Sequence, residues 1–466
     1  MSAEGSLSVK LQKLLATLPP ATRQALERAV EKARQNGLQD PIFDLLGQQF
    51  EQVNLAKKTT RLPDPKRMFM RPLGPFLVDA RPPQKTSGRI WRGALQGLWT
   101  WIEQNLAGEE VQLCRQKLRD AQNEAVLENI ERDLRASILP KLENELDRAQ
   151  QTPDTRRRFA YHVGGESQLQ ELEDIFVLQK YCDIVHALDK ELPEAPSINS
   201  QQDLEKIKKV FGRLAGTDPR LPYYAGVILH DRLEQSALPL WALACVGSDD
   251  LKQIANSPFA SLIEIALGDA GLMAEQCISE LNKPSENNQA VLYAENYAVI
   301  CRNLRSAVDF ETQTSDWLRQ LSETRMRLSN ALGEELEQMF QLMRRNVRPI
   351  RAFRSQQPLP PDEFDLDRLC FLIAMLNTVR SNIQEFALNE VVNKIYTECD
   401  SYLQMAIDSL QEDLRTHNDD GYTRIVHAYA QAAVRVSEVW HGEKQAMLVQ
   451  RSFETAGAMT QKAASG

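Results

Sequence analysis

The chain has 466 residues, of which 42% are apolar and 26% are charged. These proportions are typical of folded proteins and exclude collagen-like and highly charged disordered chains. No apolar run approaches the roughly 20 residues that a membrane-spanning helix needs, so the sequence predicts no transmembrane segment. The length predicts several domains or one long repetitive array.

The net charge of −9 conceals an uneven distribution of charge. Residues 57–92 contain ten Lys or Arg and two Asp, a net charge of +8, whereas the rest of the chain carries −17. The seven cysteines are nowhere closer than 24 residues apart, a spacing that predicts neither a disulfide framework nor a CxxC zinc site. We therefore expect reduced, buried thiols and a cytoplasmic protein without a cleaved export signal.

Apolar residues recur every three or four positions almost throughout, and no long stretch alternates strictly between apolar and polar residues. This pattern predicts an all-α protein, an elongated multi-helix bundle with a solenoid-like stack of short helices in the middle. The predicted regions are, in chain order, an N-terminal helical hairpin (1–56), a basic Pro-rich strap (57–88), a long-helix region (89–195), stacked short and medium helices (196–353), a Pro-rich hinge (354–365), a C-terminal helical hairpin (366–454) and a disordered tail (455–466).

In the long-helix region we expect one helix from about Gly88 to Ala107 and Gly108, and a second over 109–150. Pro140 predicts a kink or a break in the second helix, because proline lacks a backbone donor and clashes with the preceding turn. A polar loop over 152–165 and an amphipathic helix over 168–191 follow.

Helix-ending and helix-capping residues divide the middle region into short segments. Gly247 is predicted to end one helix, Ser248 to cap the next, and Gly268 with Asp269 to separate two more. Longer helices are expected over 287–308, 315–345 and 366–416, and a last helix from Asp420 to about Phe453.

The sequence contains no nucleophile elbow, P-loop, dinucleotide-binding fingerprint or zinc-protease motif. The spacings Asp183-x-x-His186 and Glu438-x-x-His441 place an acid and an imidazole on one helical face, but chance alone produces about one such match, so we predict no metal, cofactor or catalytic residue. An enzyme of unrecognised class stays open, because the members of a catalytic triad can be distant in sequence.

The basic segment is the most specific feature of the sequence. Its candidate partner- or anion-binding residues are Arg67, Arg71, Arg81, Lys85, Arg89, Trp91 and Arg92. One interpretation is a structural strap whose apolar residues pack on the acidic helical body and whose cations pair with Asp and Glu there. The other is a site for an acidic protein, an anionic lipid or a phosphate-bearing ligand, which guanidinium groups can bind with paired hydrogen bonds.

A second basic cluster contains Arg344, Arg345, Arg348 and Arg351. Cations are favoured at a helix C-terminus, which is its simplest explanation. If both clusters faced one groove, an anion or acidic-peptide site would become the leading hypothesis.

The absence of catalytic motifs and the long amphipathic faces predict a non-catalytic protein–protein interaction protein, a scaffold, adaptor or regulator. The alternatives are a peripheral membrane or anionic-ligand-binding protein and an enzyme of unrecognised class. Nucleic acid is disfavoured as a partner, because the −17 charge outside the basic segment would repel a polyanion. A homodimer through the apolar seam of helix 109–150 stays open.

Overall fold

The computed structural model describes residues 64–121, 124–233, 237–281, 283, 289–310, 315–349, 359–416 and 420–464. These residues are overwhelmingly helical, which confirms the all-α prediction. The described residues form two compact units, one made of residues 64–69 with those of 109–134, and the other of residues 70–108 with those from Arg135 onward. The predicted N-terminal hairpin (1–56) and residues 354–358 of the predicted hinge lie outside the described residues.

The first unit contains most of α4 (Pro65–Met70), nearly all of α6 (Gly108–Arg119) and the start of α7 (Glu124–Gln150). Lys117 on α6 forms an ion pair with Asp133 on α7, with 2.9 Å between Nζ and Oδ2. The single helix predicted over 109–150 is wrong, because α6 ends at Arg119. Pro140 does not break α7, since Ile138 and Leu142 on either side of it are buried and this packing offsets the lost hydrogen bond.

The second unit begins with the 3₁₀ helix η1 (Arg71–Phe76) and two short parallel strands, β1 (Leu77–Val78) and β2 (Ile90–Trp91). After the 3₁₀ turn η2 (Arg92–Ala94) come α5 (Leu95–Trp101) and the π-helical segment η3 (Ile102–Leu106). The helix predicted from residue 88 therefore starts seven residues later. The reason is that Ile90 and Trp91 pair with Leu77 and Val78 instead of continuing a helix.

Three helices follow α7 in this unit: α8 (Pro153–Val163), α9 (Glu166–Lys180) and α10 (Cys182–Glu191). The polar loop predicted over 152–165 is wrong, since Thr152 and Thr155 form a capping box and Phe159 and Val163 are buried. The helix predicted over 168–191 is divided into α9 and α10 at Tyr181.

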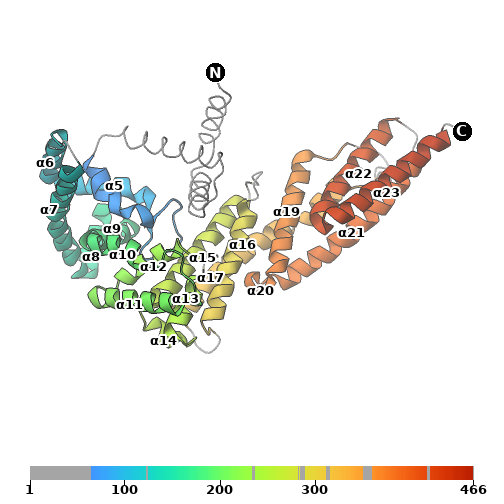
Figure 1. Cartoon of the computed structure of the whole chain (residues 1–466). Coiled ribbons are helices and arrows are strands. Elements are labelled where there is room, and N and C mark those ends of the chain that lie inside the picture. Colours follow the sequence, from blue (N-terminus) through green and yellow to red (C-terminus); the bar gives the residue numbers. More distant parts are fainter. Residues whose placement is uncertain are drawn as a thin grey trace, which may run out of the picture. The chain divides into compact units, whose positions relative to one another are not determined.

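The middle of the unit is built from helices of very different lengths (Figure 1). They are α11 (Gln201–Thr217), α12 (Leu221–His230), α13 (Leu238–Val246), α14 (Leu251–Ala255), α15 (Ala260–Leu281), α16 (Gln289–Ala307), α17 (Asp316–Leu336) and α18 (Met339–Asn346). Gly247, at φ 76°, ends α13 as predicted, but Asp250 rather than Ser248 caps α14.

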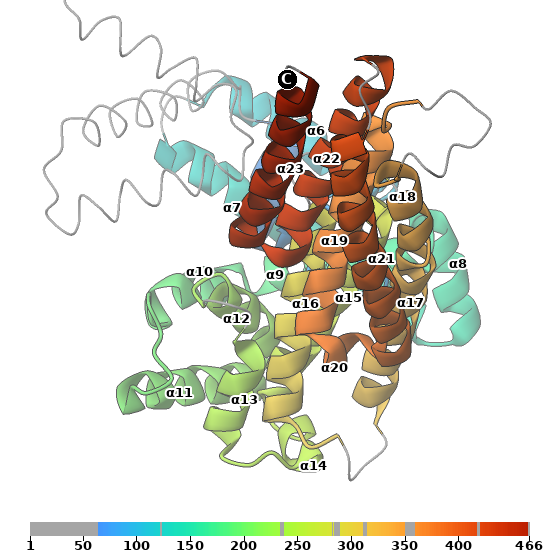
Figure 2. The same cartoon turned by 90° about the vertical axis from the view of Figure 1, so that its right-hand side faces the viewer.

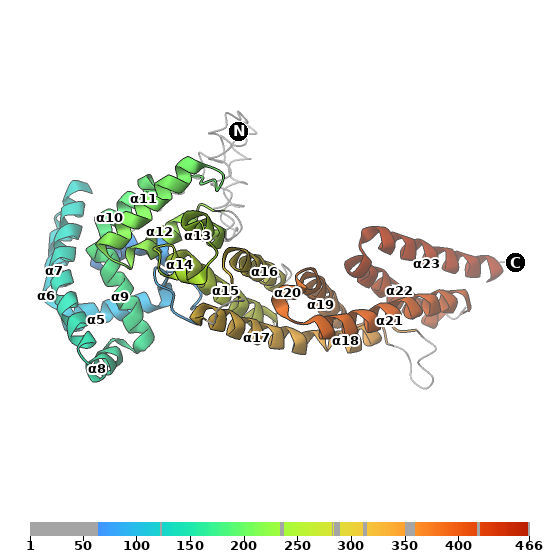
Figure 3. The same ribbon diagram turned by 90° about the horizontal axis from the view of Figure 1, so that it is seen from below.

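The predicted break at Gly268 and Asp269 is wrong, because α15 continues through both residues. This helix packs against α12, α13, α16 and α17, and Figure 3 shows it beside α16 and α17. In a solenoid each helical repeat packs mainly on the repeats directly before and after it. Because α15 instead packs on helices from several positions in the chain, the solenoid-like stack is not confirmed.

The C-terminal region contains α19 (Glu363–Ser381), α20 (Ile383–Phe386), α21 (Asn389–Thr416), α22 (Asp420–His441) and α23 (Glu443–Ala464). The last three helices pack against one another (Figure 2). Gly442, at φ 90°, divides the predicted last helix into α22 and α23. The predicted disordered tail is also wrong up to Ala464, because Phe453 and Ala456 are buried and keep α23 packed on its neighbours.

Within the described ranges, no helix has both the length and the apolar composition needed to cross a membrane.

Candidate functional site: the basic strap

Residues 79–89 connect β1 to β2 and are named the strap loop here. The loop lies against α12 and α15 at points where glycine permits close approach. A Cβ atom at Gly268 of α15 would lie 2.1 Å from Thr86 Oγ1, and one at Gly271 would lie 3.3 Å from Pro83 Cγ. Gly88 itself has φ 82° and approaches the backbone of Tyr223 on α12. The loop is therefore fitted to the helices beneath it.

Lys85 is the main charged anchor of the strap loop. Its Nζ lies 2.6 Å from Asp174 Oδ2 and 3.0 Å from Glu171 Oε2, on two residues one turn apart in α9. The side chains of Lys85, Glu171 and Asp174 are only 14%, 3% and 9% exposed. One buried lysine thus holds two buried carboxylates.

Backbone and phenol donors complete this cluster. The Gly88 amide donates to Asp174 Oδ2 at 3.3 Å, and the Trp91 amide donates to Glu171 Oε2 at 3.2 Å. The Tyr224 hydroxyl donates to Asp174 Oδ1 at 3.1 Å. Burial raises the pKa of Glu171 even though the Lys85 ammonium acts to lower it. These bonds tie the loop backbone itself, and not only a side chain, to α9.

Arg89 forms the second anchor. Its Nη2 lies 3.5 Å from Asp269 Oδ2 on α15 and 3.2 Å from His230 Nδ1 on α12. The other ring nitrogen of His230 lies 3.2 Å from Asp269 Oδ2. Lys85 and Arg89 therefore pair with acids of the helical body, as the strap interpretation predicts.

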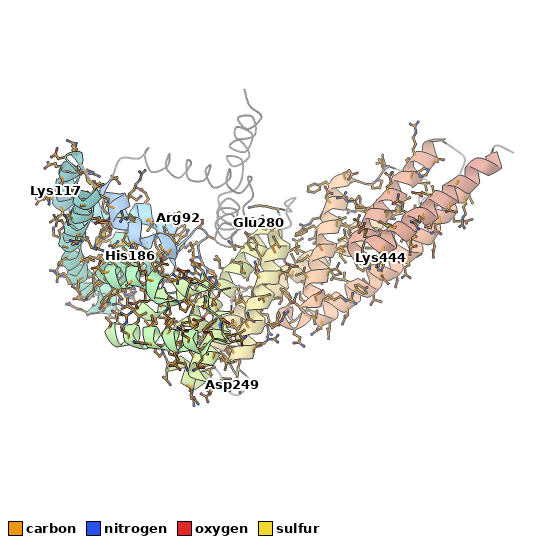
Figure 4. All side chains as sticks on the ribbon, viewed as in Figure 1. Arg92, Lys117, His186, Asp249, Glu280 and Lys444 are labelled. Carbon is orange, nitrogen blue, oxygen red and sulfur yellow. The ribbon has the colours of Figure 1, made fainter. Side chains whose placement is uncertain are left out.

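Arg81, Trp91 and Arg92 form a different arrangement, which is named the outer patch here. The guanidinium of Arg81 lies 5.3 Å from the centre of the Trp91 ring. Arg92, labelled in Figure 4, pairs with Asp79 at 2.6 Å, and both of these side chains are exposed. A Cβ atom at Gly93 would lie 2.4 Å from the Trp91 ring, so the glycine leaves room for the indole to lie over the backbone.

Two further candidates of the basic segment are exposed on short helices. Arg71 begins η1 in the same unit as the strap loop. Arg67 lies on α4 in the other unit.

The second basic cluster contacts another set of helices. Arg344 lies 5.9 Å from the ring centre of Phe340, and Arg345 pairs with Asp365 of α19 at 3.7 Å. Arg348 is half-buried, and together with Arg344 it opposes the burial that raises the pKa of Tyr402. Arg351 lies outside the described residues. A groove shared with the strap stays a prediction.

The histidines and cysteines are the remaining candidates for catalytic or metal chemistry. Across the described ranges, no three His, Cys, Asp or Glu side chains are grouped to hold a metal ion. His441 Nε2 lies 2.9 Å from Asp400 Oδ1, which links α22 to α21, while His186 is exposed (Figure 4). The seven cysteines are free thiols, six of them buried, and burial raises the pKa of Cys245, Cys277 and Cys399 to about 12, so these thiols are poor nucleophiles.

Sequence reasoning found the cations of the strap but missed their partners, Glu171, Asp174, Asp269 and His230. One signal was available: Glu171 and Asp174 interrupt an otherwise apolar face that contains Leu172 and Ile175. A buried acid needs a partner, so acids on a core-facing position indicate a cation brought from elsewhere.

No family model, no curated protein and no solved structure matches this chain.

Proposed function

We propose that the protein is a non-catalytic protein–protein interaction protein that binds an acidic segment of its partner at the outer patch, Arg81, Trp91 and Arg92. The observation that carries this proposal is the division of the basic segment. Lys85 and Arg89 turn inward to anchor the strap loop, whereas Arg81 and Arg92 are exposed, and the Arg81 guanidinium lies over the Trp91 indole.

Two physical arguments support the outer patch as a docking site. Arginine and tryptophan are the residues most enriched among those that dominate binding energy at protein interfaces. The anchors hold the loop before a partner arrives, so less conformational entropy is lost on binding. A scaffold or adaptor role and a cytoplasmic location belong to the same proposal, and the free thiols support a reducing compartment.

The test measures binding of fluorescent peptides rich in Asp and Glu, with and without an aromatic residue, by fluorescence anisotropy. Arg81→Glu/Arg92→Glu is expected to weaken binding at least about tenfold, because it places like charges against the peptide. Arg157→Glu/Arg158→Glu on α8 makes the same change in net charge at other exposed arginines and should preserve the affinity.

Parallel measurements with phosphatidylserine vesicles and with inorganic phosphate test the anionic-ligand alternatives. Vesicle binding without peptide binding would favour the peripheral membrane protein instead. If both double variants bound the peptides as the unchanged protein does, the outer patch would not be the docking site. If Arg81→Glu/Arg92→Glu weakens peptide binding, affinity capture from the native host identifies the natural partner as the protein that this variant loses and Arg157→Glu/Arg158→Glu keeps.

A further inference from the structure

The start of α19 and the residues just before it expose two large apolar side chains among several acidic residues. Leu359 and Phe364 are 75% and 73% exposed. The Leu359 carbonyl accepts a hydrogen bond of 2.9 Å from the Tyr429 hydroxyl on α22, so its backbone is held in place. This surface, residues 359–367, is named the acidic edge.

The acids of the acidic edge outnumber its cations. Four acids lie in this segment: Asp362, Glu363, Asp365 and Asp367. Arg435 of α22 pairs with Glu363 and Asp367, and Arg345 of α18 lies 3.7 Å from Asp365. Arg348, just after α18, also acts on Tyr429, whose hydroxyl binds the Leu359 carbonyl. Among the described residues, three arginines therefore oppose four acids, and the edge retains negative charge around its exposed Leu and Phe.

The outward side of α23 has the complementary character. Met447 and Leu448 are 47% and 58% exposed. Lys444 and Arg451 lie one turn before and one turn after them on the same side of the helix. Among the residues that the structure describes, neither cation forms an ion pair. Lys444 is labelled in Figure 4. This surface, residues 444–451, is named the basic face.

Two glutamates mark the margin of the basic face. Glu443 begins α23, and Glu454 accepts a 3.0 Å hydrogen bond from Gln450. They lie on the Met447 side, so the positive charge is concentrated around Leu448, between Lys444 and Arg451.

The two surfaces cannot meet within one chain. Ala446, Val449, Phe453 and Ala456 are the buried residues of α23, which packs on α21 and α22. Met447 and Leu448 therefore point away from α22, whereas the start of α19 packs on α22 through Arg435. Each surface is open to another molecule.

We propose that two copies of this chain form a two-fold dimer in which the basic face of each copy packs on the acidic edge of the other. A two-fold axis makes both contacts at once and closes the assembly. Leu359 and Phe364 would pack against Met447 and Leu448, and Lys444 and Arg451 would face Glu363 and Asp367. This inference does not depend on the outer patch.

The full chain is examined by light scattering after size-exclusion chromatography and by sedimentation, from about 1 to 100 µM, the range in which a modest interface dissociates. The mass is expected to double with concentration and not to increase further, and added salt should shift the midpoint to higher concentration. A monomer throughout this range would overturn the proposal.

Charge reversal tests the pairing itself. Lys444→Glu/Arg451→Glu makes both surfaces acidic, and Glu363→Lys/Asp367→Lys makes both basic, so each variant alone should be monomeric. An equimolar mixture should dimerise again, because each surface then faces its opposite charge in both contacts. Arg157→Glu/Arg158→Glu on α8 is the control and should dimerise normally.

Melting curves followed by circular dichroism show whether the variants are folded, since Glu363 and Asp367 also pair with Arg435. Restored dimerisation in the mixture cannot come from unfolded chains. A mixture that stays monomeric, when the unchanged protein dimerises, would mean that the dimer uses another surface.

Discussion

The strap loop and the C-terminal helices α21–α23 are held in place by different forces. The strap loop has two short strands beside it and depends on buried ion pairs made by Lys85 and Arg89. The helices α21–α23 depend on apolar side chains repeated every three or four residues, such as Val392, Leu403 and Leu410. Apolar contacts have no fixed direction and are shared among many neighbours, whereas a buried charge that loses its partner destabilises the fold strongly. A single substitution should therefore damage the strap more than the helices.

The largest expected effect is that of Lys85→Met. The substitution leaves Glu171 and Asp174 buried without their cation, and breaking a buried pair in this way typically costs about 3–5 kcal/mol. Urea denaturation measures the loss in the free energy of unfolding. Hydrogen exchange should also accelerate at the amides of Gly88 and Trp91, which donate to the two acids.

The matched control for this prediction is Lys180→Met. Lys180 pairs with Glu143 at 2.6 Å, but both side chains are about half exposed, so the cost should be roughly 0–1 kcal/mol. Equal losses in the two variants would show that the buried pairs of the strap are no more important than those at the surface.

In the C-terminal helices we expect a smaller loss from Leu410→Ala. Leu410 is fully buried on α21, and removing a buried leucine side chain costs about 3 kcal/mol. The same urea experiment measures this loss, while exchange at Gly88 and Trp91 should be unchanged. Faster exchange at these two amides would show that the strap and the C-terminal helices unfold together.

The smallest effect concerns pH. Because burial raises the pKa of Glu171 above its ordinary value of 4.5, the folded protein keeps this proton to a higher pH than the unfolded chain does. The contribution of Glu171 to the free energy of unfolding therefore falls as the pH rises above 4.5. Glu171→Gln should flatten this part of the stability profile measured by urea denaturation between pH 4 and about 7. An unchanged slope would mean that Glu171 titrates as in the unfolded chain.

The sequence predicted most of the helices but not all of their boundaries. Periodicity located α16 well, but three predicted helices are wrong as single elements. The helix over 315–345 is α17 and α18, the helix over 366–416 is α19, α20 and α21, and the helix from Asp420 to Phe453 is α22 and α23, because an apolar face continues across short breaks in the backbone. It missed α8, in which three consecutive arginines at 156–158 equal the buried apolar residues in number, and it divided α15 at Gly268. Position 268 needs glycine within the helix, because Thr86 of the strap loop leaves no room there for a side chain. A local sequence pattern cannot reveal a contact of this kind.

The candidate site was predicted only in part. The composition identified the basic segment and its tryptophan, but a list of cations cannot show which of them turn inward. Lys85 and Arg89 are separated by 86 and 180 residues from their partners Glu171 and Asp269. No local pattern connects positions so far apart.

By itself the sequence determined the helical class of this protein, the presence of buried thiols and the position of its basic segment, because periodicity and composition are local properties. Only the tertiary structure decided that Lys85 and Arg89 serve as anchors while Arg81, Trp91 and Arg92 are left on the surface. The physical reason is that burial of a charge depends on a partner, and the partners of the strap come from α9, α12 and α15, which only folding brings together.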